Sequence, residues 1–144
     1  MFESEIPPLD IIVRLLMAAG LALVLGLERE LRGKPAGLRS HMLVSVGASA
    51  FILIGLHILM TTAEGDPSAR IDPSRIVEGV IGGIGFLGAG CIIQSRGSVQ
   101  GITTGASIWI CGAIGVACGL GTLVLASMVT VLALIIMVVL GRFE

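Results

Sequence analysis

The sequence predicts an all-α integral membrane protein, a bundle of five transmembrane helices. Of its 144 residues, 55% are hydrophobic and only 13% are charged, whereas soluble domains are about 45–50% apolar and about 25% charged. The mean hydropathy is +1.04. Apolar residues also occur in runs close to the roughly 20 residues that cross a bilayer. The chain is long enough for one domain of this kind and too short for two ordinary ones.

Five apolar segments are expected to cross the membrane, at about residues 9–27, 41–60, 76–93, 103–118 and 120–140. Asp10 and Arg14 interrupt only the start of the first segment. The fourth is short and needs neighbouring helices or a thinned bilayer, and the fifth, rich in Val, Leu and Ile, is expected to face lipid. A tight turn is expected between these two, at CGLGT. We expect the segments to form a single transmembrane domain over residues 1–144, with no soluble C-terminal domain.

The basic residues of the short loops predict the orientation of the bundle. Six lie on the side of the first loop, the third loop and the tail, namely Arg29, Arg32, Lys34, Arg39, Arg96 and Arg142. Only Arg70 and Arg75 lie on the other side, where nearby acidic residues offset their positive charge. Because short cytoplasmic loops are enriched in Lys and Arg, we expect the N-terminus outside and the C-terminus in the cytoplasm. An odd number of spans agrees with this.

The stretch GVIGGIGFLGAG (residues 79–90) contains a G-x-G-x-x-G pattern. A dinucleotide-binding loop would need a strand before the pattern and a helix opening within it, and one continuous apolar segment offers neither. Within a membrane helix, small residues instead let helices approach closely. We therefore expect the third segment to be central in the bundle, with Trp109 filling volume beside the glycines. The expected packing glycines are Gly79, Gly82, Gly83, Gly85, Gly88 and Gly90.

The densest polar cluster lies at the end of the first span and contains Glu28, Arg29 and Glu30. If the helix continues, Glu28 pairs with Arg32 four residues later. The loop that follows is expected to fold Arg39 back toward Glu28 as a second partner. Three roles are open for the cluster: a charged anchor, a partner-binding surface, or carboxylates of Glu28 and Glu30 that hold a hydrated Mg²⁺. No metal site is firm.

Other polar residues lie at the ends of the later segments. Glu78, near the outer end of the third, is expected in an ion pair with Arg14 or Arg75, since ionisable residues in spans usually have partners. The alternative is that Arg14 pairs with Asp10. Thr103 and Thr104 open the fourth span and either cap its helix with Ser107 or line a polar entrance. His41 is expected at the membrane interface, and no ligand spacing supports a zinc site.

Three blocks of the sequence carry a family resemblance: GLERELRGKPAGLRSHMLVSVGASAF (residues 26–51), GGIGFLGAGCII (82–93) and VQGITTGASIWICGAIGVACGLG (99–121). They resemble the N-terminal transmembrane domain of the MgtC/SapB family. The resemblance implies a bacterial inner-membrane protein associated with magnesium homeostasis and, in pathogens, with survival inside macrophages. It also implies regulation of other membrane proteins, including the F-type ATP synthase.

The chain departs from this family at two places. Many members carry a soluble domain after the last span, and this sequence ends at Glu144. An Asn of some relatives is Thr103 here, and a Cys that follows the Trp of some relatives is Ile110, with Cys111 one step later. What is known of those two family residues does not carry over.

Several function classes are excluded or ranked by these features. No nucleophile–base arrangement suggests an enzyme, no cofactor motif is present, and no basic stripe suggests nucleic acid. We expect a regulator embedded in the lipid bilayer that adapts cells to low magnesium through other membrane proteins. The alternative is a small transporter that forms homo-oligomers, and a third possibility is a scaffold without a ligand. A transporter should bring several polar residues together at mid-membrane depth, and no inverted repeat or pair of half-helices is evident.

Overall fold

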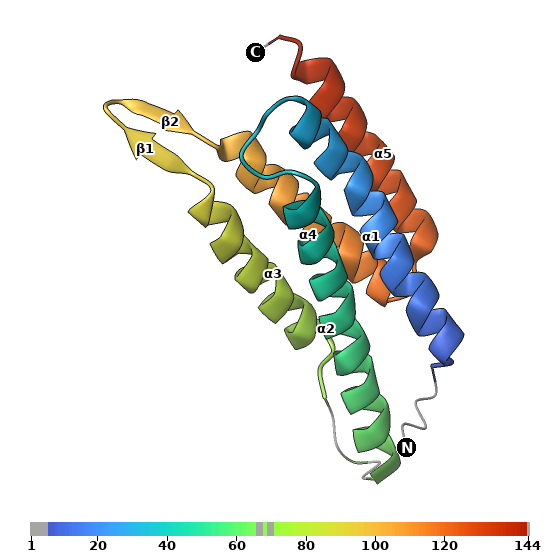
Figure 1. Ribbon diagram of the computed structural model, residues 1–144. Helices are drawn as coiled ribbons and strands as arrows, with labels where there is room; N and C mark the ends of the chain where they lie inside the picture. The colour runs from blue at the N-terminus through green and yellow to red at the C-terminus, as the bar shows by residue number, and fades with distance from the viewer. Residues whose placement is uncertain (1–5, 66–67, 69–70, 144) are drawn as a thin grey trace.

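The computed structural model describes residues 6–65, 68 and 71–143, and these form five helices and one short hairpin (Figure 1). The helices are α1 (Pro8–Leu31), α2 (Leu38–Gly65), α3 (Ser74–Gly90), α4 (Ile102–Gly119) and α5 (Leu123–Leu140). Each overlaps one of the five apolar segments predicted above, so the helical fold class is confirmed. Arg70, one of the basic residues used to predict the orientation, lies outside the described residues.

Four of the five helices are long and apolar enough to cross a membrane: α1, α2, α4 and α5. The exception is α3, which has 17 residues and is therefore about 25 Å long at 1.5 Å per residue. That length is slightly below the roughly 30 Å of hydrocarbon in a bilayer. The protein has the helices of a multi-pass membrane protein, and a crossing by α3 stays a prediction.

The central helix of the bundle is α4. It packs against each of the other four helices, and 61% of its residues are buried, against 11% in α5. Its small residues make this possible, because a Cβ added at Gly115 would overlap the carbonyl oxygen of Ser45 on α2. Our placement of Trp109 was wrong: its side chain is 47% exposed and lies on the outer face of α4, where it fills no gap between glycines.

The prediction that α3 is central was also wrong. One stripe of α3, Val80, Ile84 and Gly88, is buried, and this stripe faces α4 at Gly105 and Gly112. Of the expected packing glycines, only Gly88 approaches another backbone. A Cβ added at any of the others would meet no atom within 4 Å, and these are Gly79, Gly82, Gly83, Gly85 and Gly90. The glycines lie on several faces of α3, and a helix at the edge of a bundle uses only one face.

A hairpin that the sequence analysis treated as a loop joins α3 to α4. Strands β1 (Ile93–Ser95) and β2 (Ser98–Gln100) pair antiparallel. The two residues between them, Arg96 and Gly97, both have positive φ angles, 44° and 82°. Two-residue hairpin turns of this kind favour glycine because it adopts positive φ without steric cost. The hairpin projects from the bundle beside the start of α4 (Figure 1).

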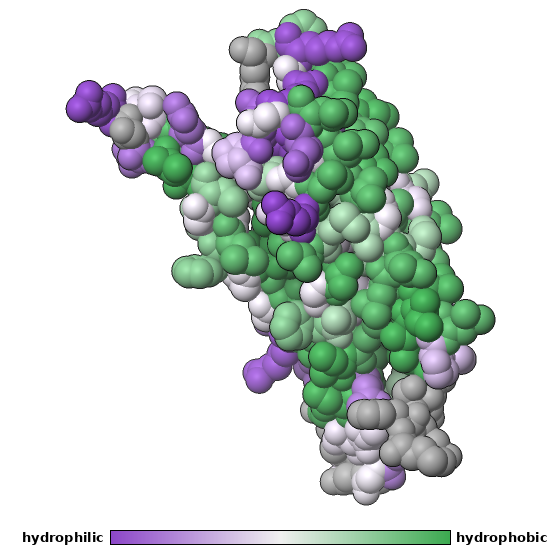
Figure 2. Space-filling model, viewed as in Figure 1, coloured by the Kyte–Doolittle hydropathy of each residue, from purple (hydrophilic) through white to green (hydrophobic). Residues whose placement is uncertain are grey.

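The polar surface gathers at one end of the bundle. We call this the charged end: α1 and α5 end there, and α2 and α4 begin there (Figure 1). Figure 2 shows hydrophilic residues at this end and on the hairpin, above a largely hydrophobic surface along the helices. Side chains of α5 such as Val124, Met128 and Leu132 are well exposed. The predicted lipid-facing character of the fifth segment agrees with this surface.

Candidate functional site

Four polar side chains are buried together inside the charged end. Arg29 of α1, His41 of α2, and Thr104 and Ser107 of α4 are each at most 4% exposed, and hydrogen bonds link them across the three helices. We call these four residues the polar network. In a bundle with the helices of a membrane protein, such residues are expensive to bury and mark functional sites more often than structural ones.

Arg29 enters the network because α1 continues as a helix beyond its apolar segment, to Leu31. The extra turn points the guanidinium into the bundle, where Nη2 donates to Oγ1 of Thr104 at 2.7 Å. A hydrogen bond from a charged donor is worth about 1.5–3 kcal/mol. The Thr104 hydroxyl therefore accepts from Arg29 and does not cap the helix, and its functional role stays a prediction. Gly101 is the N-cap of α4, with a φ of 86° and no side-chain cap.

His41 connects α2 to α4. Its Nδ1 lies 2.8 Å from the carbonyl oxygen of Gly37, and its Nε2 lies 2.9 Å from Oγ of Ser107. The Ser107 hydroxyl also lies 2.8 Å from the carbonyl oxygen of Thr104 and donates to it. The ring is fully buried against α4, and its position at the membrane interface stays a prediction. The turn at Gly37 directs the start of α2 inward and places His41 against α4.

Two serines extend the polar face of α2 deeper into the bundle. Ser45 and Ser49 follow His41 at intervals of four residues, and both are fully buried. Neither hydroxyl oxygen makes a hydrogen bond within the described residues. The next buried side chains along α2, Ile52 and Leu53, are apolar. The spacing of His41, Ser45 and Ser49 on one helical face was visible in the sequence, and it is the signal that the analysis missed.

Glu28 lies beside the network with a different partner from the one we proposed. Its Oε1 is 2.5 Å from Nε of Arg32, and its side chain is only 9% exposed. The predicted pair four residues apart is thus confirmed. The predicted pair with Arg39 is wrong, because Arg39 is exposed and no ion pair joins it to Glu28 among the described residues. Arg32 also donates to the carbonyl oxygen of Gly141 at 3.0 Å, which ties α1 to the end of α5.

Glu30 has a structural role at the start of α2. Its Oε2 accepts a hydrogen bond from the backbone N–H of Leu38 at 3.0 Å, one of the N–H groups that a helix leaves without a partner in its first turn. Glu28 and Glu30 are therefore engaged separately and do not form the shared magnesium site that we considered. The described residues contain no cluster of three or more His, Cys, Asp or Glu side chains suited to a metal ion.

The structure keeps two further predicted residues apart from the network. Thr103 is exposed beside the buried Thr104. Glu78 is exposed on α3, and among the described residues no ion pair joins it to Arg14 or Arg75. Arg14 instead pairs with Asp10 at 2.7 Å, which was the alternative, and it donates to the carbonyl oxygen of Gly119 at the end of α4. The expected ion pair of Glu78 was wrong.

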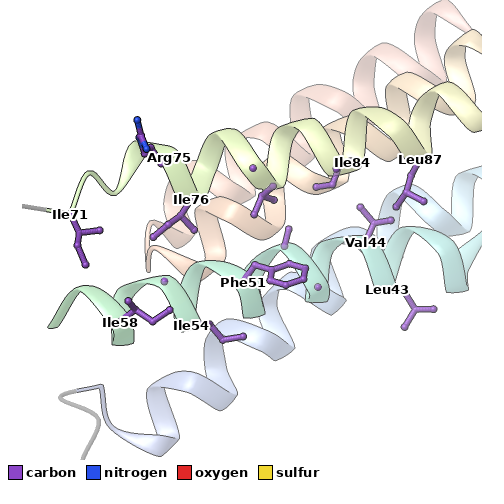
Figure 3. Close-up of a pocket in the computed structure, with 16 residues that line it drawn as sticks. Leu43, Val44, Phe51, Ile54, Ile58, Ile71, Arg75, Ile76, Ile84 and Leu87 are labelled. Carbon is purple, nitrogen blue, oxygen red and sulfur yellow. The ribbon is translucent and has the colours of Figure 1, made fainter. Parts of the chain in front are cut away.

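An apolar groove of about 820 Å³ separates α2 from α3. Figure 3 shows apolar side chains of both helices along it, among them Phe51, Ile54 and Ile84, with Arg75 at one end. The open face of Gly79 and Gly83 also lines this groove. Its lining lacks the convergent polar groups of a small-molecule site.

Comparisons with known proteins assign most of the chain to one set of relatives. A family model described as the MgtC family matches residues 15–144. The chain is 37% identical over 128 residues to the putative magnesium transporter YhiD of Escherichia coli (strain K12), a match that covers 89% of this chain and 59% of that protein. No solved structure matches the chain.

Two further relatives match the chain at similar identity. Protein SrpB of Synechococcus elongatus is 43% identical over 118 residues, covering 75% of this chain and 62% of that protein. Protein MgtC of Salmonella typhimurium (strain LT2) is 43% identical over 110 residues, covering 76% of this chain and 43% of that protein. The chain thus spans between 43% and 62% of the length of these three relatives.

Proposed function

The chain belongs to the MgtC family, whose model covers it from residue 15 to residue 144, and we propose that it is a regulator of other membrane proteins in magnesium-limited bacteria. The inner membrane is its proposed location. Its proposed partners are the lipid bilayer and other membrane proteins, with the F-type ATP synthase suggested by the family resemblance. A homo-oligomer is compatible with this role, and the proposal assigns no catalytic activity.

The observation that carries this proposal is that the buried polar side chains His41, Ser45 and Ser49 of α2, which we call the polar column, end inside the bundle. From His41 to Ser49 the column covers about 12 Å at 1.5 Å per residue, and the next buried side chains of α2 are Ile52 and Leu53. A transporter needs polar groups along a path that reaches both faces of the membrane. In a single copy of this chain, the polar side chains of this face of α2 extend only from the charged end to Ser49. This arrangement favours a sensing or regulatory site.

The second candidate function is transport of magnesium or another solute. The relative YhiD is named a putative magnesium transporter, and the buried Arg29 and His41 are more polar than the core of a purely structural bundle requires. An oligomer could complete a path that one chain lacks. Direct measurement of magnesium flux separates the two candidates.

We propose that the charged end faces the cytoplasm. The basis is the bias of six basic residues against two. Lys34→Cys, made together with Cys91→Ala, is expected to resist an impermeant thiol reagent added to intact cells and to react after permeabilisation. Glu64→Cys, at the far end of α2, is expected to react in intact cells. Cys111 and Cys118 are fully buried and should give no background. Labelling of Lys34→Cys from outside would reverse the orientation.

The polar network is proposed to be the part of the protein on which regulation depends. Thr104→Val keeps the shape of the side chain and removes the acceptor from Arg29, at a cost of about 1.5–3 kcal/mol. In a strain that lacks the gene, this variant is expected to restore growth in low magnesium poorly. Wild type is expected to restore growth. The total magnesium content of the cells is not expected to rise with the amount of the protein. Growth, cell magnesium and membrane abundance of the protein are the measurements.

Two matched variants control this experiment. Thr103→Val changes the exposed neighbour, and Thr104→Ser retains the hydroxyl. Both are expected to support growth like wild type. Full growth with Thr104→Val would show that the network is not required for the function. Cell magnesium that rises with expression of the protein would favour the transporter.

A further inference from the structure

The hydrogen bonds around His41 need one more proton than a neutral ring supplies. The Gly37 carbonyl oxygen can only accept, so Nδ1 carries a proton and donates to it across 2.8 Å. The Thr104 carbonyl oxygen can also only accept, so the Ser107 hydroxyl gives its one proton to that contact at 2.8 Å. The remaining 2.9 Å contact, between Nε2 and Oγ of Ser107, then requires a proton on Nε2. A hydroxyl has one proton and two lone pairs, and only the imidazolium has protons on both nitrogens.

We infer that His41 is a buried proton-binding site. The Ser107 hydroxyl changes its hydrogen-bond partner between the neutral and the protonated state of the ring. When the ring is neutral, Nε2 accepts the Ser107 proton, and the hydrogen bond from Ser107 to Thr104 is broken. When the ring is protonated, the added proton sits on the former lone pair of Nε2. Nε2 then donates to Ser107, which donates to the Thr104 carbonyl oxygen. Proton uptake raises the charge of the site by one, reverses the direction of the hydrogen bond between α2 and α4, and extends it to the Thr104 carbonyl oxygen.

The surrounding charges act on this site in opposite directions. Burial of the ring disfavours the imidazolium most, and the hydrogen bond to the Gly37 carbonyl oxygen favours it; of two charged groups on α1, the buried Arg29 guanidinium disfavours it and the Glu28 carboxylate favours it. Helix α4 contributes Ser107 and Thr104 and contains no Asp, Glu, Lys, Arg or His. On α2 itself, the exposed Arg39 lies two residues before His41. Glu28 is itself paired with Arg32, whose positive charge offsets part of the effect of the carboxylate on the ring.

The inference goes beyond the proposed function, because it holds whether the protein regulates or transports. It gives the network a ligand, the proton, and a change in the direction of the hydrogen bond between α2 and α4. Histidine suits this role, since the protonation of an unperturbed histidine changes between about pH 5 and pH 8. Arg29 donates to Oγ1 of Thr104, the residue whose carbonyl oxygen accepts from Ser107.

The test is ¹⁵N NMR of histidine-labelled protein in lipid nanodiscs, with His57→Gln so that His41 gives the only histidine signal. Wild type is expected to convert reversibly between the neutral ring, protonated on Nδ1, and the imidazolium as the pH falls. Ser107→Ala removes an acceptor that favours the charged ring, and its imidazolium-to-imidazole ratio at a given pH is expected to be about tenfold lower.

Ser107→Thr, which keeps the hydroxyl, serves as the control and is expected to titrate like wild type. A wild-type ring that stays in one neutral tautomer over the whole range from about pH 5 to pH 8 would overturn the inference, and this outcome needs no variant to fold. If His41 titrates equally in Ser107→Ala and in wild type, the inference is also overturned, because the Ser107 hydroxyl would then not respond to the protonation of the ring.

Discussion

Replacing Gly115 by alanine is expected to destabilise the bundle by about 1–3 kcal/mol, the usual cost of forcing extra atoms into a packed core. The added Cβ would overlap the carbonyl oxygen of Ser45 and lie 2.8 Å from Cβ of Ala48. The backbone of α2 cannot move aside as the end of a flexible side chain can. Separation of α2 from α4 would also pull His41 away from Ser107. Folded fraction and thermal stability in detergent are the measurements.

Gly83→Ala is the matched control for this prediction. The residue is a glycine in the middle of α3, and a Cβ there would meet no atom within 4 Å. Because alanine favours the helix over glycine by about 1 kcal/mol, this variant is expected to be neutral or slightly more stable than wild type. Equal losses at Gly115 and Gly83 would contradict the placement of α4 at the centre and α3 at the edge.

The two glycines show why sequence alone misplaced the third helix. Glycine spacing indicates that a backbone can be approached closely, but not which glycines find a partner. In α3 the glycines lie on several faces, whereas α4 presents Gly115 and Gly119 to the backbone of α2. The helices themselves were predictable, because each needs only a run of apolar residues. Their order around the centre depends on contacts between residues far apart in the chain.

In the candidate site, contacts within one helix could be predicted from the sequence, and contacts between distant segments could not. The local pairs, Glu28 with Arg32 and Asp10 with Arg14, follow from spacing within one helix and are present. The pair of Glu28 with Arg39 depended on the path of a loop and is absent from the described structure. The network itself joins Arg29 to Thr104, 75 residues later. No local pattern predicts that contact, although the polar face that begins at His41 pointed to a buried site on α2.

The measurement that tests the central claim most directly is magnesium flux through the purified protein alone. The protein is reconstituted into liposomes that contain a magnesium indicator, beside empty liposomes and liposomes with an established magnesium channel. If the polar column is closed beyond Ser49 and the protein acts as a regulator, magnesium entry will equal that of the empty liposomes. Saturable entry that grows with the amount of protein, and that Thr104→Val reduces, would contradict the account and establish transport through the network.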